Sequence, residues 1–127
     1  MKYTTIKEHH LYNKTFQRGM RYSGKYVSVF VLRDLAAKRL ARENPEKKPY
    51  NRFGVSVTKR VGGAVQRSRV KRILRAGYRA VEPEIKTGFL VVVSPRAGIL
   101  SAKSTDVERE LRRGLEKIGM FRTNEPL

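Results

Sequence analysis

Three segments of the chain have the apolar spacing of β-strands. Six of the seven residues of Tyr26–Leu32 (YVSVFVL) are apolar, most of them β-branched or aromatic, and a period of two separates three valines from Ser28 and Phe30 on the opposite face. Phe53–Lys59 (FGVSVTK) alternates strictly, so its second face carries only glycine, serine and threonine. Phe89–Ser94 (FLVVVS) is almost entirely apolar, which is typical of a strand buried on both faces.

Helical spacing predicts three main helices. Between Ile6 and the expected stop at Gly19, Tyr12 and Phe16 stand four residues apart and share one face. Residues 64–81 place apolar side chains on one side and basic side chains on the other. The last helix is expected to open with a capping box at Thr105–Glu108.

The inner faces of the last two helices can be assigned from this spacing. Gly77 lies on the inner face of the first, and glycine lowers helix propensity by about 1 kcal/mol relative to alanine. It therefore predicts a close approach to the sheet. The predicted inward residues are Val70, Ile73, Leu74, Gly77, Tyr78 and Val81, and then Val107, Leu111, Leu115 and Ile118.

These elements predict one α+β domain over residues 1–127, a sandwich in the order helix–strand–insertion–strand–helix–strand–helix. A single helix between two strands indicates that those strands are parallel. The insertion, Arg33–Tyr50, is either a short helix on a long connection or a mobile basic loop. Met1–Thr5 is polar and expected to be loose, and residues 122–127 are expected to form a tail.

The charge balance points to a polyanionic partner. The chain has 127 residues, 29 of them Lys or Arg against 11 Asp or Glu, and a formal net charge of +18. A membrane is the rival polyanion, but no apolar run approaches the roughly 18–20 residues of a spanning helix. There is no signal-peptide pattern and no cysteine, so we expect a cytoplasmic protein without a disulfide-linked partner.

Much of this charge lies in Lys59–Arg79, which contains eight basic residues and no acidic one; widening the window to Asn51–Val81 adds Arg52. A solvated helix face is the usual explanation of a charged helix, but such faces mix glutamate with lysine, as the last helix does with Glu108, Glu110 and Glu116. We therefore expect contact with nucleic acid. Six of the eight are arginine, which binds phosphate in a bidentate manner and stacks on bases.

The faces of the first two predicted strands that are not purely aliphatic favour RNA over DNA. Tyr26, Ser28 and Phe30 stand beside Gly54, Ser56 and Thr58 in the expected sheet. Rings and hydroxyls next to a basic helix suit unpaired nucleotides. The alternative is that the rings of Tyr26 and Phe30 are buried against the first helix, and both descriptions can hold together.

The sequence does not support catalysis by this chain alone. Its two histidines, His9 and His10, are adjacent and therefore make a poor metal pair, and the carboxylates lie outside the basic segment. Glu82 and Glu84 flank Pro83, and a solvated turn is favoured there over a contact with a cation. No nucleophile–base pair and no metal ligand are indicated.

The segment FGVSVTKRVGGAVQRSRVKRILRAGYR resembles the signature of the bacterial ribonuclease P protein component. The matching positions are Gly54, Ser56, Val57, Lys59, Arg60, Gly62, Ala64, Val65, Arg67, Arg69, Lys71, Arg72 and Arg75. The likeness covers roughly residues 6–121, including the aromatic pair before Gly19 and FLVVVSPRA before the last helix. Ser68 and Gly63 stand where the family has asparagine.

The resemblance implies an α/β sandwich with a left-handed βαβ crossover, against the usual hand. It also implies a subunit that joins a large catalytic RNA, binds precursor tRNA and helps to remove its 5′ leader, with Mg²⁺ held mainly by the RNA. The implied contacts to the RNA subunit are Lys59, Arg60, Arg67, Ser68, Arg69, Lys71, Arg72 and Arg75. The implied leader-binding groove contains Tyr12, Phe16, Tyr26, Ser28, Phe30, Ser56 and Thr58.

Two alternatives remain open from the residues. A ribosomal or other structured-RNA-binding protein would need the basic helix but not the aromatic groove. A protein-only nuclease would need clustered carboxylates, which the sequence does not suggest.

Overall fold

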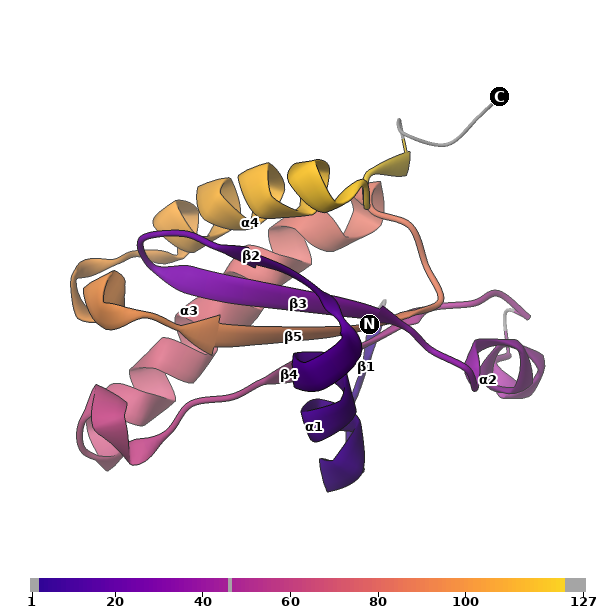
Figure 1. Cartoon of the computed structure of the whole chain (residues 1–127), viewed down its shortest axis with the longest axis horizontal. Helices are drawn as coiled ribbons and strands as arrows, with labels where there is room; N and C mark the ends of the chain where they lie inside the picture. Colours follow the sequence, from indigo (N-terminus) through magenta and orange to yellow (C-terminus); the bar gives the residue numbers. More distant parts are fainter. Residues whose placement is uncertain (1–2, 46, 123–127) are drawn as a thin grey trace.

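The computed structural model describes residues 3–45 and 47–122, and the strands in this part of the chain form a five-stranded sheet in the order β1-β4-β5-β3-β2 (Figure 1). The strands are β1 (Tyr3–Thr5), β2 (Met20–Ser23), β3 (Val27–Arg33), β4 (Asn51–Val55) and β5 (Phe89–Pro95). The helices are α1 (His9–Arg18), α2 (Ala37–Glu43), α3 (Ala64–Val81) and α4 (Ser104–Ile118). Short 3₁₀ turns are η1 (Lys59–Val61), η2 (Glu82–Glu84) and η3 (Ala97–Ser101).

The sheet is mixed, which confirms the predicted α+β class. Strands β4 and β5 are adjacent and parallel, as expected for two strands joined by one helix, and β1 pairs parallel to β4. Strand β3 is antiparallel to both β5 and β2. The hand of the β4–α3–β5 crossover remains a prediction.

Helices cover both faces of the sheet, so each strand divides its side chains between two apolar clusters. Helices α3 and α4 lie together on one face, and α1 lies on the other (Figure 1). Val27, Val29 and Val31 of β3 belong to the α3–α4 cluster, whereas Phe30 belongs to the α1 cluster. The period-two assignment is therefore confirmed within β3, which begins one residue after Tyr26.

Strand β4 begins and ends earlier than its alternation predicted. It runs from Asn51 rather than Phe53, because β1 pairs with this end and the Asn51 side chain bonds neighbouring backbone. The Asn51 amide donates to the Lys86 carbonyl and accepts from the Phe89 N–H, both at 2.9 Å. After Val55 only the Ser56 N–H continues the ladder, to the carbonyl of Val93, and the chain then turns into η1.

The closing helix corrects two predictions. It starts one residue before Thr105, and the carboxylate that caps it is that of Asp106, which accepts from the Lys103 N–H at 2.9 Å. Gly77 is needed for packing against this helix, not against the sheet. A Cβ on Gly77 would lie 2.6 Å from Cγ1 of Val107, so only glycine lets α3 and α4 approach this closely.

Glu110 of α4 is buried, although the sequence predicted an ordinary solvated carboxylate. Its Oε1 accepts hydrogen bonds from the backbone N–H groups of Tyr26 and Val27, each at 2.7 Å, where β3 begins. A carboxylate can occupy this buried place because it satisfies two donors that the sheet leaves unpaired.

The N-terminus also differs from its prediction: Tyr3–Thr5 forms strand β1 instead of a loose end. Of the predicted tail, residues 123–127 lie outside the described residues.

Candidate nucleic-acid interface

The basic face of α3 is reached through a glycine turn after η1. Gly62 has a φ of 145°, a conformation that strongly favours glycine. The N–H of Gly63 donates to Oε1 of Gln66 at 2.6 Å, so a glutamine amide braces the turn. This turn joins η1, which carries Lys59 and Arg60, directly to the start of α3.

The residues predicted to bind the RNA subunit lie along η1 and the outer side of α3. Two of them also make backbone bonds: Arg67 donates to the Gly62 carbonyl at 3.0 Å, and Arg69 to the Ala102 carbonyl at 2.8 Å. None of the ion pairs found within residues 3–45 and 47–122 involves any of these cations. Lys59, Arg60, Ser68, Arg72 and Arg75 are exposed, and Arg67, Arg69 and Lys71 are half-buried.

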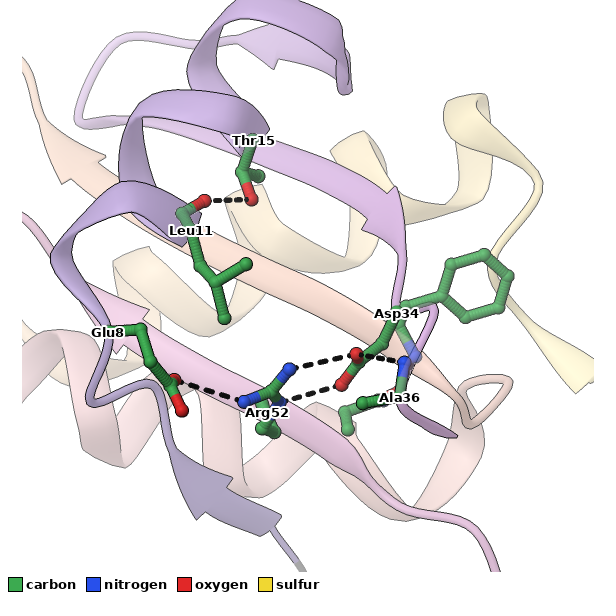
Figure 2. A network of polar contacts seen from close by, with 8 residues as sticks. Glu8, Leu11, Thr15, Asp34, Ala36 and Arg52 are labelled. Carbon is green, nitrogen blue, oxygen red and sulfur yellow. Dashed lines mark hydrogen bonds and ion pairs between the residues drawn. The ribbon is translucent and has the colours of Figure 1, made fainter. Parts of the chain in front are cut away.

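Arg52, which the sequence placed in the same basic window, belongs elsewhere. Its guanidinium is buried and binds both carboxylate oxygens of Asp34, at 2.7 and 2.9 Å, and Oε2 of Glu8 at 3.1 Å (Figure 2). The hydrogen bond that Arg52 donates to Asp34 raises the pKa of Arg52, against the effect of burial. This cation is neutralised inside the protein and is not available to a polyanion.

Helix α1 packs its aromatic residues on the centre of the sheet. The rings of Phe16 and Phe30 meet edge to face, with centroids 4.8 Å apart. The Tyr12 hydroxyl lies over Gly54, where a Cβ would come within 2.2 Å of it. The two α1 rings are half-buried and Phe30 is 9% exposed, so burial of Phe30 against α1 is found as the alternative interpretation predicted.

The charge of one α3 residue, Arg75, affects the pKa of a tyrosine in this aromatic site. Burial raises the pKa of Tyr12, and the positive charge of Arg75 lowers it in part. Helices α1 and α3 cover opposite faces of the sheet, so the basic face and the aromatic face are separate surfaces.

The hydroxyl residues lie beyond the aromatic ones, along the same face of the sheet. The strand register aligns Ser28 with Ser94, and the Ser56 N–H bonds to Val93, next to Ser94. Ser28 is 8% exposed and its hydroxyl shares a hydrogen bond of 2.9 Å with that of Ser23. A row of three serines therefore crosses β3, β5 and the end of β4.

An open hollow of about 790 Å³ lies between η1 and η3, at this end of the sheet. We call it the η1–η3 hollow. The serines at 56 and 94 line it together with Thr58, Lys59, Arg60 and Arg96. The sequence prediction missed Ser94 and Arg96, although Ser94 ends the predicted strand and Arg96 follows two residues later. The register of β5 against β4 was needed to show that they lie beside Thr58.

The structure does not place Tyr26 with the other predicted leader-binding residues. This tyrosine precedes β3, so strand alternation does not govern its direction. Its ring packs against the α3–α4 cluster and lies beside Gly98, with Nζ of Lys25 at 5.3 Å from the ring centroid. The predicted groove therefore divides into the aromatic site under α1 and the η1–η3 hollow, without Tyr26.

The carboxylates of the described residues do not form a metal site. They contain no group of three or more His, Asp or Glu side chains that could hold a metal ion. Glu84, predicted to be solvated, pairs with Arg112 at 2.6 Å, and Glu82 is buried. In this part of the chain no helix is both long and apolar enough to cross a membrane.

Comparisons with known proteins agree with one another. A family model described as Ribonuclease P matches residues 1–119. The ribonuclease P protein component of Natranaerobius thermophilus is 32% identical over 94% of this chain and 94% of its own length. That of Syntrophomonas wolfei is 30% identical over 97% of this chain and 93% of its own length.

Solved structures show the same fold at lower identity. The RNase P protein of Staphylococcus aureus superposes with a TM-score of 0.71 at 18% identity, covering 96% of this chain and 99% of that one. The protein from Thermotoga maritima gives 0.67 at 21% identity, covering 86% and 92%. With the family model matching residues 1–119 and two relatives at 30% identity or more, the chain belongs to the ribonuclease P protein family.

Proposed function

We propose that this chain is the protein subunit of a ribonuclease P ribonucleoprotein, in which it helps to remove the 5′ leader from precursor tRNA. The α3 face would bind the RNA subunit, and the aromatic site with the η1–η3 hollow would bind the unpaired leader. The observation that carries this proposal is the η1–η3 hollow, where two cations predicted to bind the RNA subunit, Lys59 and Arg60, line the same space as the predicted leader-binding residues Ser56 and Thr58. A protein that bound only one structured RNA would not need the second surface.

The chemistry of each surface suits its proposed ligand. The arginines and lysines of η1 and α3, which form no ion pair within the described residues, match the regularly spaced phosphates of a folded RNA. The half-buried ring of Tyr12 or Phe16 can stack on a base, and the hydroxyls of Ser56, Thr58 and Ser94 can bond phosphate or 2′-hydroxyl oxygens.

Magnesium, which the family resemblance implies for the holoenzyme, is proposed to be held by the RNA subunit. The described residues of this chain do not fit such an ion, because they contain no cluster of three acidic or histidine ligands. No step of the cleavage is therefore assigned to a group on this chain. Its contribution is binding and positioning.

The central experiment is reconstitution with the RNA subunit of a bacterial ribonuclease P at low magnesium, using a precursor tRNA. We expect the protein to stimulate cleavage at the 5′ end of the mature sequence and to cleave nothing alone. Unchanged cleavage by the RNA would refute the proposal, and cleavage by the protein without RNA would favour a protein-only nuclease.

The α3 assignment is tested separately with Arg72→Ala combined with Arg75→Ala. Both side chains are exposed, so the variant should fold normally. The slope of log affinity for the RNA subunit against log salt should fall by roughly 1.4–1.8, since each phosphate contact contributes ~0.7–0.9. The matched control, Arg113→Ala with Lys117→Ala on α4, removes the same charge and should keep the wild-type slope. Equal slopes in both variants would contradict the assignment.

The leader assignment is tested with Phe16→Ala. Affinity of the holoenzyme for precursor tRNA should fall by about 1–3 kcal/mol, the contribution of one base stack, while affinity for mature tRNA stays the same. The free energy of unfolding is measured in parallel, because Phe16 also packs on Phe30. An equal loss for both tRNAs would indicate that the ring serves packing alone.

A further inference from the structure

A basic groove lies beside the α2 insertion, at the end of the sheet opposite to the η1–η3 hollow. It is open, has a volume of about 970 Å³, and is bounded by α2 and by the turn that leads into β5. Its cations are Arg33, Lys38, Arg42 and Lys86, and its apolar residues include Ala41 and Phe89. We call it the α2 groove. Figure 1 shows α2 projecting from the sheet on the side away from η1 and the start of α3.

The positive charge of the α2 groove is not balanced within the described chain. Residues 33–50 contain six basic residues and three acidic ones, at 34, 43 and 46. The first acid is buried against Arg52, and the second pairs with Arg39 at 3.6 Å on the surface. No ion pair among the residues that the structure describes involves Lys38, Arg42 or Lys86.

The root of the insertion is firmly attached, so these cations are presented at a defined place. Asp34 is fixed by the bidentate bond from Arg52 (Figure 2). Its own N–H donates to the Gly88 carbonyl at 3.0 Å. Its Oδ1 also accepts from the Ala36 N–H at 3.0 Å, just before α2 begins. Nearby, the Arg33 guanidinium lies 5.8 Å from the ring centroid of Phe89, a cation–π contact at the edge of the groove.

We propose that the α2 groove binds the sugar–phosphate backbone of the RNA subunit, as a second contact separate from α3. This inference rests on the proposed function. Lys38, Arg42 and Lys86 would neutralise phosphates, and the Arg33–Phe89 pair offers a flat surface for a base or ribose. A groove with unbalanced positive charge and a half-buried ring suits an RNA backbone better than it suits the apolar surface of another protein.

The two contacts would reach different parts of the RNA. The α2 groove lies at the first residue of β5, and the η1–η3 hollow lies at its last. Seven strand residues at ~3.3 Å each separate them by roughly 20 Å. The insertion would thus lengthen the protein–RNA interface beyond η1 and the start of α3.

The first experiment measures the salt dependence of affinity for the RNA subunit in Lys38→Ala combined with Arg42→Ala. Both side chains are exposed on a short helix, and alanine preserves helix propensity. The slope of log affinity against log salt should fall by roughly 1.4–1.8. The α4 control, Arg113→Ala with Lys117→Ala, should leave it unchanged, and an unchanged slope in the α2 variant as well would overturn the inference.

The second experiment locates the contact. Because the chain has no cysteine, Lys38→Cys and Arg72→Cys each create one attachment point for iron–EDTA. Hydroxyl radicals from position 38 should cut the RNA subunit, without substrate, at a segment that radicals from position 72 do not reach. Cuts from 72 alone would overturn this inference and leave the proposed function standing, and no cuts from either would refute both. Cuts from 38 confined to added precursor tRNA would also overturn it.

Discussion

Replacing Asp34 by alanine is expected to destabilise the protein by about 3 kcal/mol. The side chains of Asp34 and Arg52 are 2% and 10% exposed, so removal of the carboxylate leaves a buried guanidinium with only Glu8 as a partner. Loss of one member of a buried ion pair costs about 3–5 kcal/mol. The lower end applies here because Glu8, 48% exposed, still contacts Arg52 at 3.1 Å.

The measurement is urea unfolding followed by circular dichroism, with the slope of free energy against urea checked for constancy. The matched control is Glu43→Ala, which removes the surface pair with Arg39, whose partners are 61% and 63% exposed. That control should lose no more than about 0.5 kcal/mol. Adding Arg52→Met to Asp34→Ala should recover part of the loss, because the unpaired charge is then gone. A loss below about 1 kcal/mol for Asp34→Ala alone would refute this account.

The same pair predicts how stability responds to acid. Burial alone would raise the pKa of Asp34, but hydrogen bonds from Arg52 and the Ala36 N–H, with the charges of Arg52 and Arg39, lower it below its ordinary 3.8. A carboxylate with a lowered folded-state pKa stabilises the fold above its unfolded-state pKa, and the benefit is lost as pH falls through the folded-state value. Wild type should therefore lose more stability than Asp34→Ala below about pH 4. Parallel acid curves would contradict this.

Three further substitutions probe the packing of the aromatic site, the contact between α3 and α4, and the buried hydrogen bonds of Glu110. Gly54→Ala would place a Cβ 2.2 Å from the Tyr12 hydroxyl, so it should displace that ring and reduce affinity for precursor tRNA more than for mature tRNA in holoenzyme binding assays. Gly77→Ala would collide with Val107 at 2.6 Å, and a loss of about 1–3 kcal/mol is expected in urea unfolding. Glu110→Ala leaves two backbone N–H groups at the start of β3 without their acceptor, and each should cost about 1–3 kcal/mol of stability. Thermal denaturation measures this loss. An unchanged melting temperature would count against the buried hydrogen bonds.

The sequence determined those features that depend on periodicity and on sign of charge. The alternation in β3 assigned its valines and Phe30 to opposite faces, and the helical spacing of residues 64–81 gave the bounds of α3. The excess of cations without carboxylates in α3 predicted its surface chemistry, because a helix exposes whatever its apolar arc does not bury. These are local properties, so a single segment is enough to infer them.

The tertiary structure decided which residues meet across the chain. Arg52 counted as one more cation in the basic window until Asp34 and Glu8, distant in sequence, were found to enclose it. Gly77 faces α4 rather than the sheet, and Glu110 caps the start of β3, because helix packing sets these contacts and spacing within one helix cannot. Long-range pairing likewise aligned Ser94 with Ser28 and brought it beside Thr58. Partners that are remote in the sequence can be identified only once the sheet register and the helix docking are known.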